Sequence, residues 1–204
     1  MNRRQLLEQG GRYALAAGVA PWWRLVPSFA SSDPRVTALA RELQGDVLGR
    51  DDAGYNAARL LPSTRFDAVK PLAIALCETA GDVARCIRWS KRQGVPLRAR
   101  SGGHSYGGWS TVHGGLVVDV GRMNAITVDA AGATARVGAG ARLIDVYEAL
   151  WERRRTIPAG SCPTVGIAGL TLGGGIGFSA RRHGLTCDNM LEQLTAVHHG
   201  NLDR

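Results

Sequence analysis

Beyond residue 70, the hydrophobic and polar positions follow patterns typical of alternating strands and helices. The apolar run Leu72–Cys77 predicts a buried strand, and Val95–Arg100 predicts another. Between them, Thr79 with Asp82 three positions later is typical of a capped helix start, and Gly94 is typical of a helix end. We therefore expect a strand–helix–strand unit whose second strand leads into a glycine-rich loop.

Two short helices are predicted ahead of this unit. Val36–Leu43 carries apolar residues at helical spacing and is expected to end at Gly45. Tyr55–Leu61 is expected to form a second helix, which Pro62 stops. Residues 33–68 are therefore predicted to be an N-terminal helical segment that precedes the main domain.

The pattern changes after the glycine-rich loop. Gly115–Val120, Ala125–Asp129 and Thr134–Val137 are short β-rich runs separated by turns, which favours a meander over further crossovers. Apolar residues at helical spacing over Leu143–Trp151 predict an amphipathic helix, and the last apolar run, Leu191–Val197, predicts a strand. Together these elements predict an α+β fold in which sheet elements carry two glycine-rich loops.

The composition indicates a folded domain with an unusual use of glycine. Hydrophobic residues make up 45% of the 204-residue chain and charged residues 21%. No apolar stretch reaches the roughly 18 residues of a membrane-spanning helix, so neither disorder nor a membrane span is expected. The 27 glycines gather at 102–115 and 160–177 without a collagen-like repeat. Such clusters favour loops that hold a cofactor.

The net charge of +8 suggests nucleic-acid binding, which other features of the sequence would have to support. Residues 1–32 contribute +3 of this charge, and the only run of three basic residues is Arg153–Arg155. No interleaved aromatic residues and no zinc-finger, homeodomain or RNA-recognition pattern accompany that run, so nucleic-acid binding is not expected. A modest positive field suits a phosphate-bearing cofactor equally well.

Residues 1–32 are predicted to be a twin-arginine signal peptide. The arginine pair of Asn2–Leu7 (NRRQLL) is followed by a weakly apolar segment, Tyr13–Ala20, and by the small residues of Phe29–Ser32, where cleavage is plausible. The alternative is a short basic amphipathic helix, which a glycine and a proline in this stretch disfavour. We therefore expect the twin-arginine export machinery as a partner and a periplasmic or extracellular location. This route carries folded proteins, which suits a chain that loads its cofactor in the cytoplasm.

The four cysteines do not form a metal-binding pattern. Cys77, Cys86, Cys162 and Cys187 include no C-x-x-C pair and no histidine partner at zinc spacing, so no metal site is expected. An even number of cysteines permits disulfides in an exported protein without requiring them. Cys77 and Cys86 stand in apolar surroundings, where an unpaired buried thiol is the commoner state.

The first glycine-rich loop, Arg100–Gly108, follows a predicted strand. Its consecutive glycines allow backbone N–H groups to turn inward as an anion nest, to which Arg100, Ser101 and Ser105 can add donors. Such a nest could hold a pyrophosphate. From these residues alone, a tight surface turn is an equally good interpretation.

The second loop, Gly160–Gly177, has glycines at positions 166, 169 and 173. On a helical turn this spacing presents a bare face on which a flat ring could lie closely, and the alternative is a face that packs against another element. The string Gly175–Ala180 matches G-x-G-x-x-A, the dinucleotide fingerprint. It follows no strand and no acidic residue ends a second strand about 20 positions on, so a nicotinamide site is not expected.

Three stretches together resemble one known family of enzymes: Arg100–Tyr106, Gly160–Gly177 and Gly184–Asn189. The sequence resembles the berberine bridge enzyme-like branch of the vanillyl-alcohol oxidase / p-cresol methylhydroxylase family of FAD-linked oxidases. The resemblance runs from about Tyr55 to Val197 and includes Gly114–Asn124 (GGLVVDVGRMN) and Val137–Arg142 (VGAGAR). It implies an FAD-binding domain of the p-cresol methylhydroxylase (PCMH) type over 69–204, with two small sheet and helix subdomains.

The resemblance also implies a covalently bound FAD. Its diphosphate is expected on the Ser101–Ser105 loop, with one bond from His104 to the 8α carbon of the ring system and a second from Cys162 to ring carbon 6. Taken alone, His104 could be a loop histidine and Cys162 a buried thiol, and the surrounding motifs favour attachment. The implied cofactor-binding residues are Arg100, Ser101, Gly102, Gly103, His104, Ser105, Tyr106, Gly160, Cys162, Val165, Gly166, Gly169, Gly173 and Gly174.

The implied activity is that of an FAD-dependent oxidase. Such an enzyme transfers a hydride from an alcohol or amine carbon of a small-molecule substrate to FAD and passes the electrons to molecular oxygen. Members of the family are far longer than 204 residues, so this chain is expected to end inside the flavin domain, incomplete at the C-terminus. The alternative is therefore a non-catalytic flavin-binding fragment without a substrate domain. No residue is assigned as the substrate-side base.

Overall fold

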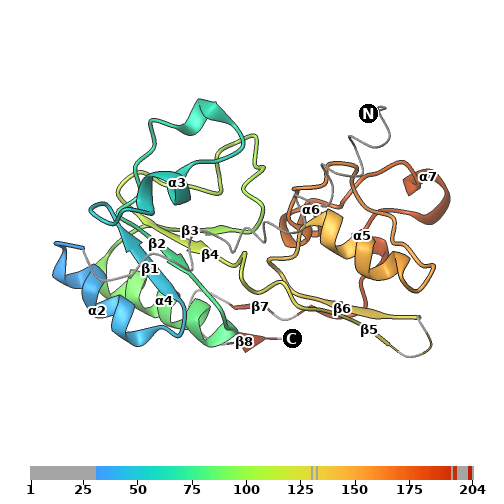
Figure 1. The fold of residues 1–204 in the computed structure, drawn as a ribbon, viewed down its shortest axis with the longest axis horizontal. Coiled ribbons are helices and arrows are strands. Elements are labelled where there is room, and N and C mark those ends of the chain that lie inside the picture. The colour runs from blue at the N-terminus through green and yellow to red at the C-terminus, as the bar shows by residue number, and fades with distance from the viewer. Residues whose placement is uncertain (1–30, 130, 132, 194, 197–201, 204) are drawn as a thin grey trace, which may run out of the picture.

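The computed structural model describes residues 31–129, 131, 133–193, 195, 196, 202 and 203. Apart from Ser31 and Ser32, the predicted signal segment lies outside the described residues. Figure 1 shows two regions side by side, a sheet with its helices on the left and a smaller region around α5 and α6 on the right. Each region has its own cluster of buried hydrophobic residues, and the α+β prediction is confirmed.

The first region is built on a four-stranded mixed sheet with the order β1-β2-β4-β3. β1 (Asp46–Gly49) pairs antiparallel with β2 (Ala73–Leu76). β4 (Leu116–Asp119) lies between β2 and β3 (Leu97–Arg100) and pairs parallel with both. Sequence analysis did not predict β1, which adds a strand to a segment that was expected to be helical.

The predicted meander is wrong in its first strand. The run at 115–120 forms the central strand β4, and only the two later runs pair antiparallel, as β5 (Ile126–Val128) and β6 (Ala135–Val137). A continuous apolar run such as that of β4 is typical of a parallel strand buried on both faces. This burial is observed, because Leu116 and Val118 face one hydrophobic cluster and Val117 faces another.

The predicted strand–helix–strand unit is formed by β2, α4 (Ala80–Gln93) and β3. Thr79 and Asp82 make the expected capping box, and Gly94 closes the helix in the left-handed conformation with φ of 62°. β2 and β3 are nevertheless not neighbours, since β4 inserts between them. The helix was therefore predicted correctly, whereas the order of the strands was not predictable from it.

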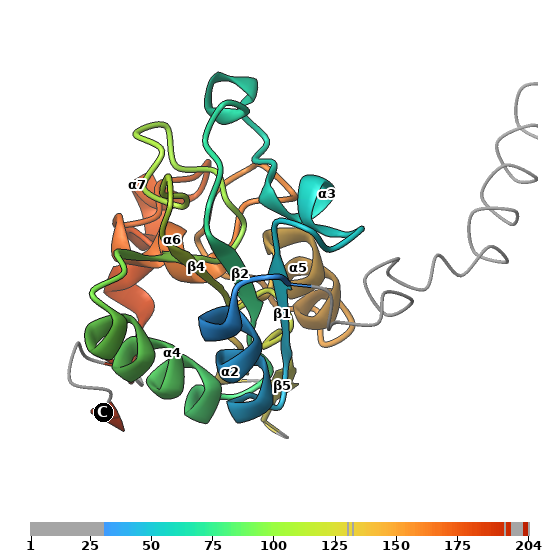
Figure 2. The ribbon, with the colours of Figure 1, turned by 90° about the vertical axis from the view of Figure 1, so that its left-hand side faces the viewer.

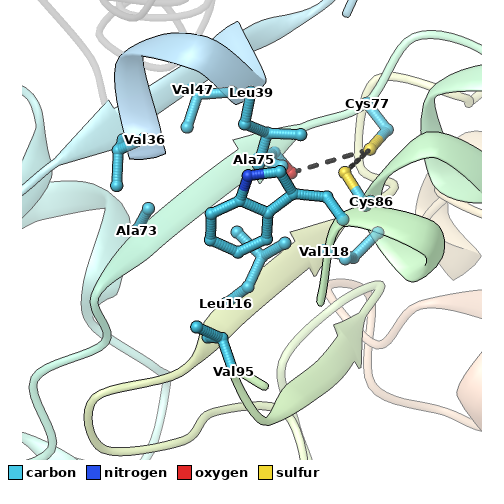
Figure 3. Packing of buried hydrophobic residues seen from close by; sticks show 11 residues of the cluster. Val36, Leu39, Val47, Ala73, Ala75, Cys77, Cys86, Val95, Leu116 and Val118 are labelled. Carbon is cyan, nitrogen blue, oxygen red and sulfur yellow. Dashed lines mark hydrogen bonds between the residues drawn. The ribbon is translucent and has the colours of Figure 1, made fainter. Parts of the chain in front are cut away.

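Two helices cover one face of the sheet. α2 (Pro34–Glu42) and α4 lie side by side on it (Figure 2) and pack Leu39 and Trp89 against the strands. Within this cluster the Sγ atoms of Cys77 and Cys86 point toward one another at 3.9 Å, both buried and unbridged (Figure 3). The hydrogen bond with Cys86 and, after it, burial of the thiol raise the pKa of Cys77. The expectation of two unpaired buried thiols is confirmed.

The opposite face of the sheet is covered by the segment that precedes β2. α3 (Tyr55–Arg59) buries Tyr55 against Ile74 of β2 and Val117 of β4, and the Tyr55 hydroxyl donates to the carbonyl of Pro71 at 2.6 Å. A short 3-10 helix, Thr64–Phe66, follows. Burial raises the pKa of Tyr55 and outweighs the opposite effect of the nearby Arg50 and Arg59. The segment 33–68 thus packs on both faces of the sheet.

The second region has a smaller core. α5 (Leu143–Trp151) forms as predicted and buries Leu143, Val146 and Leu150. These side chains pack with Ala159 and with Ile167, the first residue of α6 (Ile167–Leu172). The hairpin of β5 and β6 contributes partly buried apolar side chains to the same cluster. The second region therefore depends on one helix face and a two-stranded hairpin.

The C-terminal part contains short elements. They are α7 (Ala180–His183), a 3-10 helix at Cys187–Asn189, β7 (Thr195–Ala196) and β8 (Leu202–Asp203), and the two strands pair antiparallel. The strand predicted over Leu191–Val197 is limited in the structure to β7, and Val197 lies outside the described residues. Within the described part of the chain, no helix has the length and apolar character needed to cross a membrane.

Candidate functional site

The first glycine-rich loop begins where two parallel strands end. Arg100 is the last residue of β3 and is the register partner of Asp119, the last residue of β4. The carboxyl ends of both strands therefore meet at one edge of the sheet, and Ser101–Gly108 leaves from that edge. Crevices at the carboxyl ends of parallel strands are the common ligand sites of open α/β sheets.

Arg100 lies beneath this loop in a buried ion pair. Its Nε donates to Oδ2 of Asp119 at 2.5 Å, and the side chain is 6% exposed. The other carboxylate oxygen of Asp119 accepts from the backbone N–H of Gly121 at 2.7 Å. Nη1 of Arg100 is buried and has no hydrogen-bond partner among the described residues. Arg100, which was predicted to add a donor to the loop, therefore lies at the base of the loop, and its Nη1 group has no partner among the described residues.

The two glycine-rich loops touch at a pair of glycines. A Cβ atom on Gly102 would come within 2.3 Å of the nitrogen of Gly166, and a Cβ atom on Gly166 would come within 2.1 Å of Oγ of Ser101. The Ser101 hydroxyl also donates to the carbonyl of Ala139 at 2.7 Å, which ties the loop to the second region. At these two positions glycine therefore serves close packing, which was one of the two readings left open for the second loop.

Residues of the N-terminal segment support the first loop from below. Gly103 and Gly108 adopt positive φ angles of 73° and 72°. A Cβ atom on Gly103 would lie 3.1 Å from the Leu61 side chain, and one on Gly108 would lie 2.5 Å from the ring of Phe66. Sequence reasoning missed these supporting residues, because nothing local marks an apolar residue in a loop as a support for a distant glycine.

His104 reaches across to the second loop. Its Nε2 lies 2.9 Å from Oγ1 of Thr164, and its side chain is half-buried. Cys162 stands two residues before Thr164 and is an exposed free thiol. The structure thus brings together the loops that carry both predicted attachment residues. Thr164 was missed by sequence reasoning, although it lies inside the CPTVG stretch of the second motif.

Ser105 and Tyr106 are the remaining predicted residues of the first loop. Oγ of Ser105 accepts from the backbone N–H of Trp109 at 3.2 Å, so this hydroxyl also shapes the loop itself. Tyr106 is 93% exposed and Trp109 76% exposed. The loop therefore presents aromatic surface to the outside.

The start of the second loop is held by the N-terminal end of α5. Leu143 donates its backbone N–H to the carbonyl of Val165 at 3.0 Å, and Ile144 donates to that of Pro163 at 3.0 Å. Gly166 forms an isolated antiparallel bridge with Arg142. These contacts on both sides of Thr164 hold its backbone in place.

The helix that follows carries the predicted bare face. Gly169 is exposed in α6, and a Cβ atom built there would meet nothing within 4 Å. Gly173, four residues later, is also exposed, and its nearest neighbours are carbonyl oxygens of α6 itself. Gly169 and Gly173 therefore leave open surface on α6, in contrast to Gly166.

The end of the second loop is joined to the third motif stretch. The Thr186 hydroxyl donates to the carbonyl of Pro158 at 2.7 Å, and the Thr186 N–H donates to that of Gly175 at 3.0 Å. Gly174 adopts φ of 98°, and its carbonyl accepts from the Cys187 N–H at 3.0 Å. All three motif stretches thus meet in one part of the molecule.

Gly160 lies at the buried start of the second loop. Its carbonyl accepts from the Tyr147 hydroxyl at 2.6 Å, and a Cβ atom there would lie 2.6 Å from the Leu170 side chain. Burial raises the pKa of Tyr147. Gly160 therefore joins the loop to α5 and α6.

These features fit a large cofactor that carries both a flat ring and an anionic group. The bare surface at Gly169 has room for a ring, because no side chain covers it. The first loop offers backbone N–H groups next to a buried guanidinium that has one donor to spare. Among the described residues, no group of three His, Cys, Asp or Glu side chains is placed to hold a metal ion.

Known proteins are similar to this chain in sequence and in fold. The FAD binding domain family matches residues 71–201. The FAD-linked oxidoreductase YgaK of Bacillus subtilis is 40% identical over 151 residues, which are 74% of this chain and 33% of YgaK. The (R)-6-hydroxynicotine oxidase of Paenarthrobacter nicotinovorans is 38% identical over 149 residues, or 73% of this chain and 32% of that enzyme.

A solved structure shows the same architecture. Wild-type berberine bridge enzyme-like protein 1 of Physcomitrella patens aligns with a TM-score of 0.78 and 39% identity over 83% of this chain and 37% of its own. The chain thus spans about a third of the length of the curated relatives it matches.

Proposed function

This chain belongs to the FAD binding domain family of FAD-linked oxidoreductases, and from that premise we propose that it holds FAD between its two glycine-rich loops as part of an oxidase. The resemblance to the vanillyl-alcohol oxidase / p-cresol methylhydroxylase family is confirmed. The observation that carries the proposal is the contact between the loops. Gly102 packs on Gly166, and His104 is hydrogen-bonded to Thr164, so the two motifs lie in direct contact.

FAD bound here would supply an acceptor for a hydride from an alcohol or amine carbon of a small-molecule substrate. Backbone N–H groups of Ser101–Ser105 would hold the diphosphate, with the Arg100 guanidinium beneath them. The open surface at Gly169 and Gly173 would accept the ring system, since neither residue has a side chain to obstruct it. The further predicted contacts from Tyr106, Val165 and Gly174 stay predictions.

His104 and Cys162 are proposed as the two points of covalent attachment. Attachment at His104 would replace a C–H bond of the 8α carbon and the N–H bond of the imidazole with one N–C bond. The two protons and the electron pair released would reduce molecular oxygen, by way of the flavin, to hydrogen peroxide. Attachment of Cys162 to ring carbon 6 would replace a C–H and an S–H bond with one C–S bond at the same balance. Cys162 is an exposed thiol, whereas Cys77 and Cys86 are fully buried in the sheet region and out of reach.

A second candidate function is flavin binding without turnover. Large apolar side chains at the end of the second loop and directly after it are exposed, among them Ile176 at 77% and Phe178 at 95%. A site that excludes water during hydride transfer covers such side chains. Peroxide production on substrate addition separates the two candidates, because a non-catalytic flavin protein binds FAD and makes none.

We further propose that the protein is exported. The support is the sequence of residues 1–32, with its arginine pair followed by an apolar and a small-residue segment. Replacing Arg3 and Arg4 together by Lys should leave the chain in the cytoplasm with its FAD content unchanged. Export of this double variant at the normal level would contradict the proposal.

The experiment that tests covalent attachment is acid precipitation of the full chain after incubation with FAD. Wild type should keep yellow colour and flavin fluorescence in the pellet. The variants His104→Ala and Cys162→Ala should each keep part of it through the remaining bond, and the double variant should release all of it. His113→Ala is the matched control and should behave as wild type, because His113 is exposed and its ring accepts a hydrogen bond from the backbone N–H of Lys70, outside both glycine-rich loops. Complete release from either single variant would refute two-point attachment.

A further inference from the structure

The orientation of the His104 ring is set by a residue 60 positions away. His104 follows Gly103, which has a positive φ of 73° and lies close to the Leu61 side chain. The first loop therefore fixes the backbone from which the His104 side chain extends. The ring itself then spans the gap between the loops and places Nε2 at 2.9 Å from Oγ1 of Thr164. The second loop therefore decides which ring nitrogen is engaged.

Thr164 is a firm partner for this bond. The residues on either side of it, Pro163 and Val165, accept backbone hydrogen bonds from Ile144 and Leu143 at the start of α5. Its own carbonyl oxygen lies against the first loop, 2.8 Å from where a Cβ atom on Gly102 would stand. The hydroxyl is thus presented from a backbone that is held on two sides.

We propose that Thr164 is a positioning residue for flavin attachment: its hydroxyl accepts the proton of Nε2 of His104 and thereby leaves Nδ1 as the free nucleophile. This inference rests on the proposed function, since it concerns the same attachment residue. In a neutral imidazole one nitrogen carries the proton and the other a lone pair, and the hydrogen bond of one nitrogen settles the state of the other. Thr164 is exposed, so its own O–H can be donated to water while its oxygen accepts from the ring.

In the proposed tautomer, Nδ1 has both properties that a nucleophile needs. It holds the lone pair, and it is not the ring nitrogen that Thr164 engages. Attachment through Nε2 would require this bond to break first. Because Cys162 is two residues from Thr164, the same hydrogen bond also keeps His104 in a fixed relation to the loop that carries the second attachment residue.

The first test reads the ring directly and needs no cofactor. Long-range ¹⁵N–¹H spectra of the full chain without FAD should show His104 protonated on Nε2. Thr164→Val removes the hydroxyl at nearly constant shape and should give a mixture of tautomers, whereas Thr164→Ser should restore the wild-type pattern. Thr156→Val is the matched control, since its exposed hydroxyl bonds only locally, to the carbonyl of Ile157 in the described structure. An unchanged His104 spectrum in Thr164→Val would overturn the proposal.

The second test follows attachment of FAD. Acid-stable flavin should form about fivefold more slowly in Thr164→Val than in wild type, which is the size of one neutral hydrogen bond, and Thr164→Ser should recover the rate. Nuclear magnetic resonance of the isolated flavin peptide should show the bond at Nδ1. Equal rates, or a bond at Nε2, would refute the role of Thr164. Wild type without any acid-stable flavin would refute the proposed attachment instead, and the spectra without FAD would still decide the tautomer.

Discussion

The two regions of the molecule are shaped differently, the sheet region by packed side chains and the second region by close contacts between backbones. In the sheet region, side chains fill the interior: Leu116 and Trp89 are 0% and 1% exposed, and two helices cover them. In the second region, backbones meet directly at glycines such as Gly166, while Leu172 remains 71% exposed. Side-chain burial stabilises the first region, and the absence of side chains allows the close approaches that shape the second.

The candidate site lies where these two regions meet. The sheet region contributes the Arg100–Asp119 ion pair and the first loop, and the second region contributes Thr164 and the bare surface of α6. A rigid sheet edge thus faces a glycine-rich partner with few side chains. The contact between the two regions also positions individual side chains, such as His104 against Thr164.

Substitution of leucine should distinguish the two regions most strongly. Leu116→Ala opens a cavity in the sheet core and should lower the free energy of unfolding by about 2–5 kcal/mol. Leu172→Ala removes an exposed side chain and should change it by no more than about 0.5 kcal/mol. Urea titration of both variants provides the measurement. Similar losses in the two variants would show that Leu172 is covered, and the contrast between the regions would fail.

Substitution of glycine should sharpen the contrast within the second region. Gly166→Ala places a methyl group against the backbone of Gly102 and should cost about 3 kcal/mol, the upper end for overpacking. Gly169→Ala meets no neighbour and should stabilise α6 by roughly 0.5–1 kcal/mol, yet weaken FAD binding. Thermal unfolding and FAD titration together check both outcomes. Unchanged FAD affinity in Gly169→Ala would exclude this surface as the ring site.

Asp82 tests the acid stability of the sheet region, where the expected effect is smaller. Burial raises the pKa of Asp82, but backbone N–H donors from Gln44, Glu78, Gly45 and Thr79 outweigh burial and hold it below the ordinary value of 3.8. A lowered pKa in the folded state stabilises above the unfolded pKa, and this contribution is lost as the pH falls through the folded value. Wild type should therefore lose stability below about pH 4.

The variant Asp82→Asn should lose about 1–2 kcal/mol at neutral pH and should show a shallower decline in acid, because it has no proton to take up. Glu42→Gln is the control, since this carboxylate pairs with Arg92 at the surface and should matter by no more than about 0.5 kcal/mol. Guanidinium titrations between about pH 2 and 7 give the slopes. Parallel slopes for wild type and Asp82→Asn would rule out this carboxylate as the source of acid sensitivity.

The elements that the sequence predicted well have local signals. α4 is bounded by the Thr79–Asp82 pair and by Gly94, and α5 shows its apolar face over 143–151. β4 was assigned to a meander, because a short apolar run fits either a hairpin or a central parallel strand, and only its pairing partners decide between them. β1 is four residues long and has no periodicity that could separate it from a loop.

The residues of the candidate site also divide into those with a local sequence signal and those without one. Both glycine-rich loops were identified from the sequence, because clustered glycines are a strong signal, and the family resemblance pointed to His104 and Cys162 as the proposed attachment residues. The partner Thr164 was not found, since a threonine within a motif has no chemistry that distinguishes it. Its role depends on a contact across 60 positions.

By itself, the sequence determined the family, the α+β class and the segments in which the proposed cofactor residues stand, because each depends on residue types at short spacing. Tertiary structure alone decided the strand order, the burial of Arg100 under the loop and the different roles of identical glycines. Gly166 and Gly169 are three positions apart in one motif. A Cβ atom on Gly166 would lie 2.3 Å from the backbone nitrogen of Gly102, whereas a Cβ atom on Gly169 would meet only open space. The physical reason is that steric room around a residue is set by atoms far away in the chain.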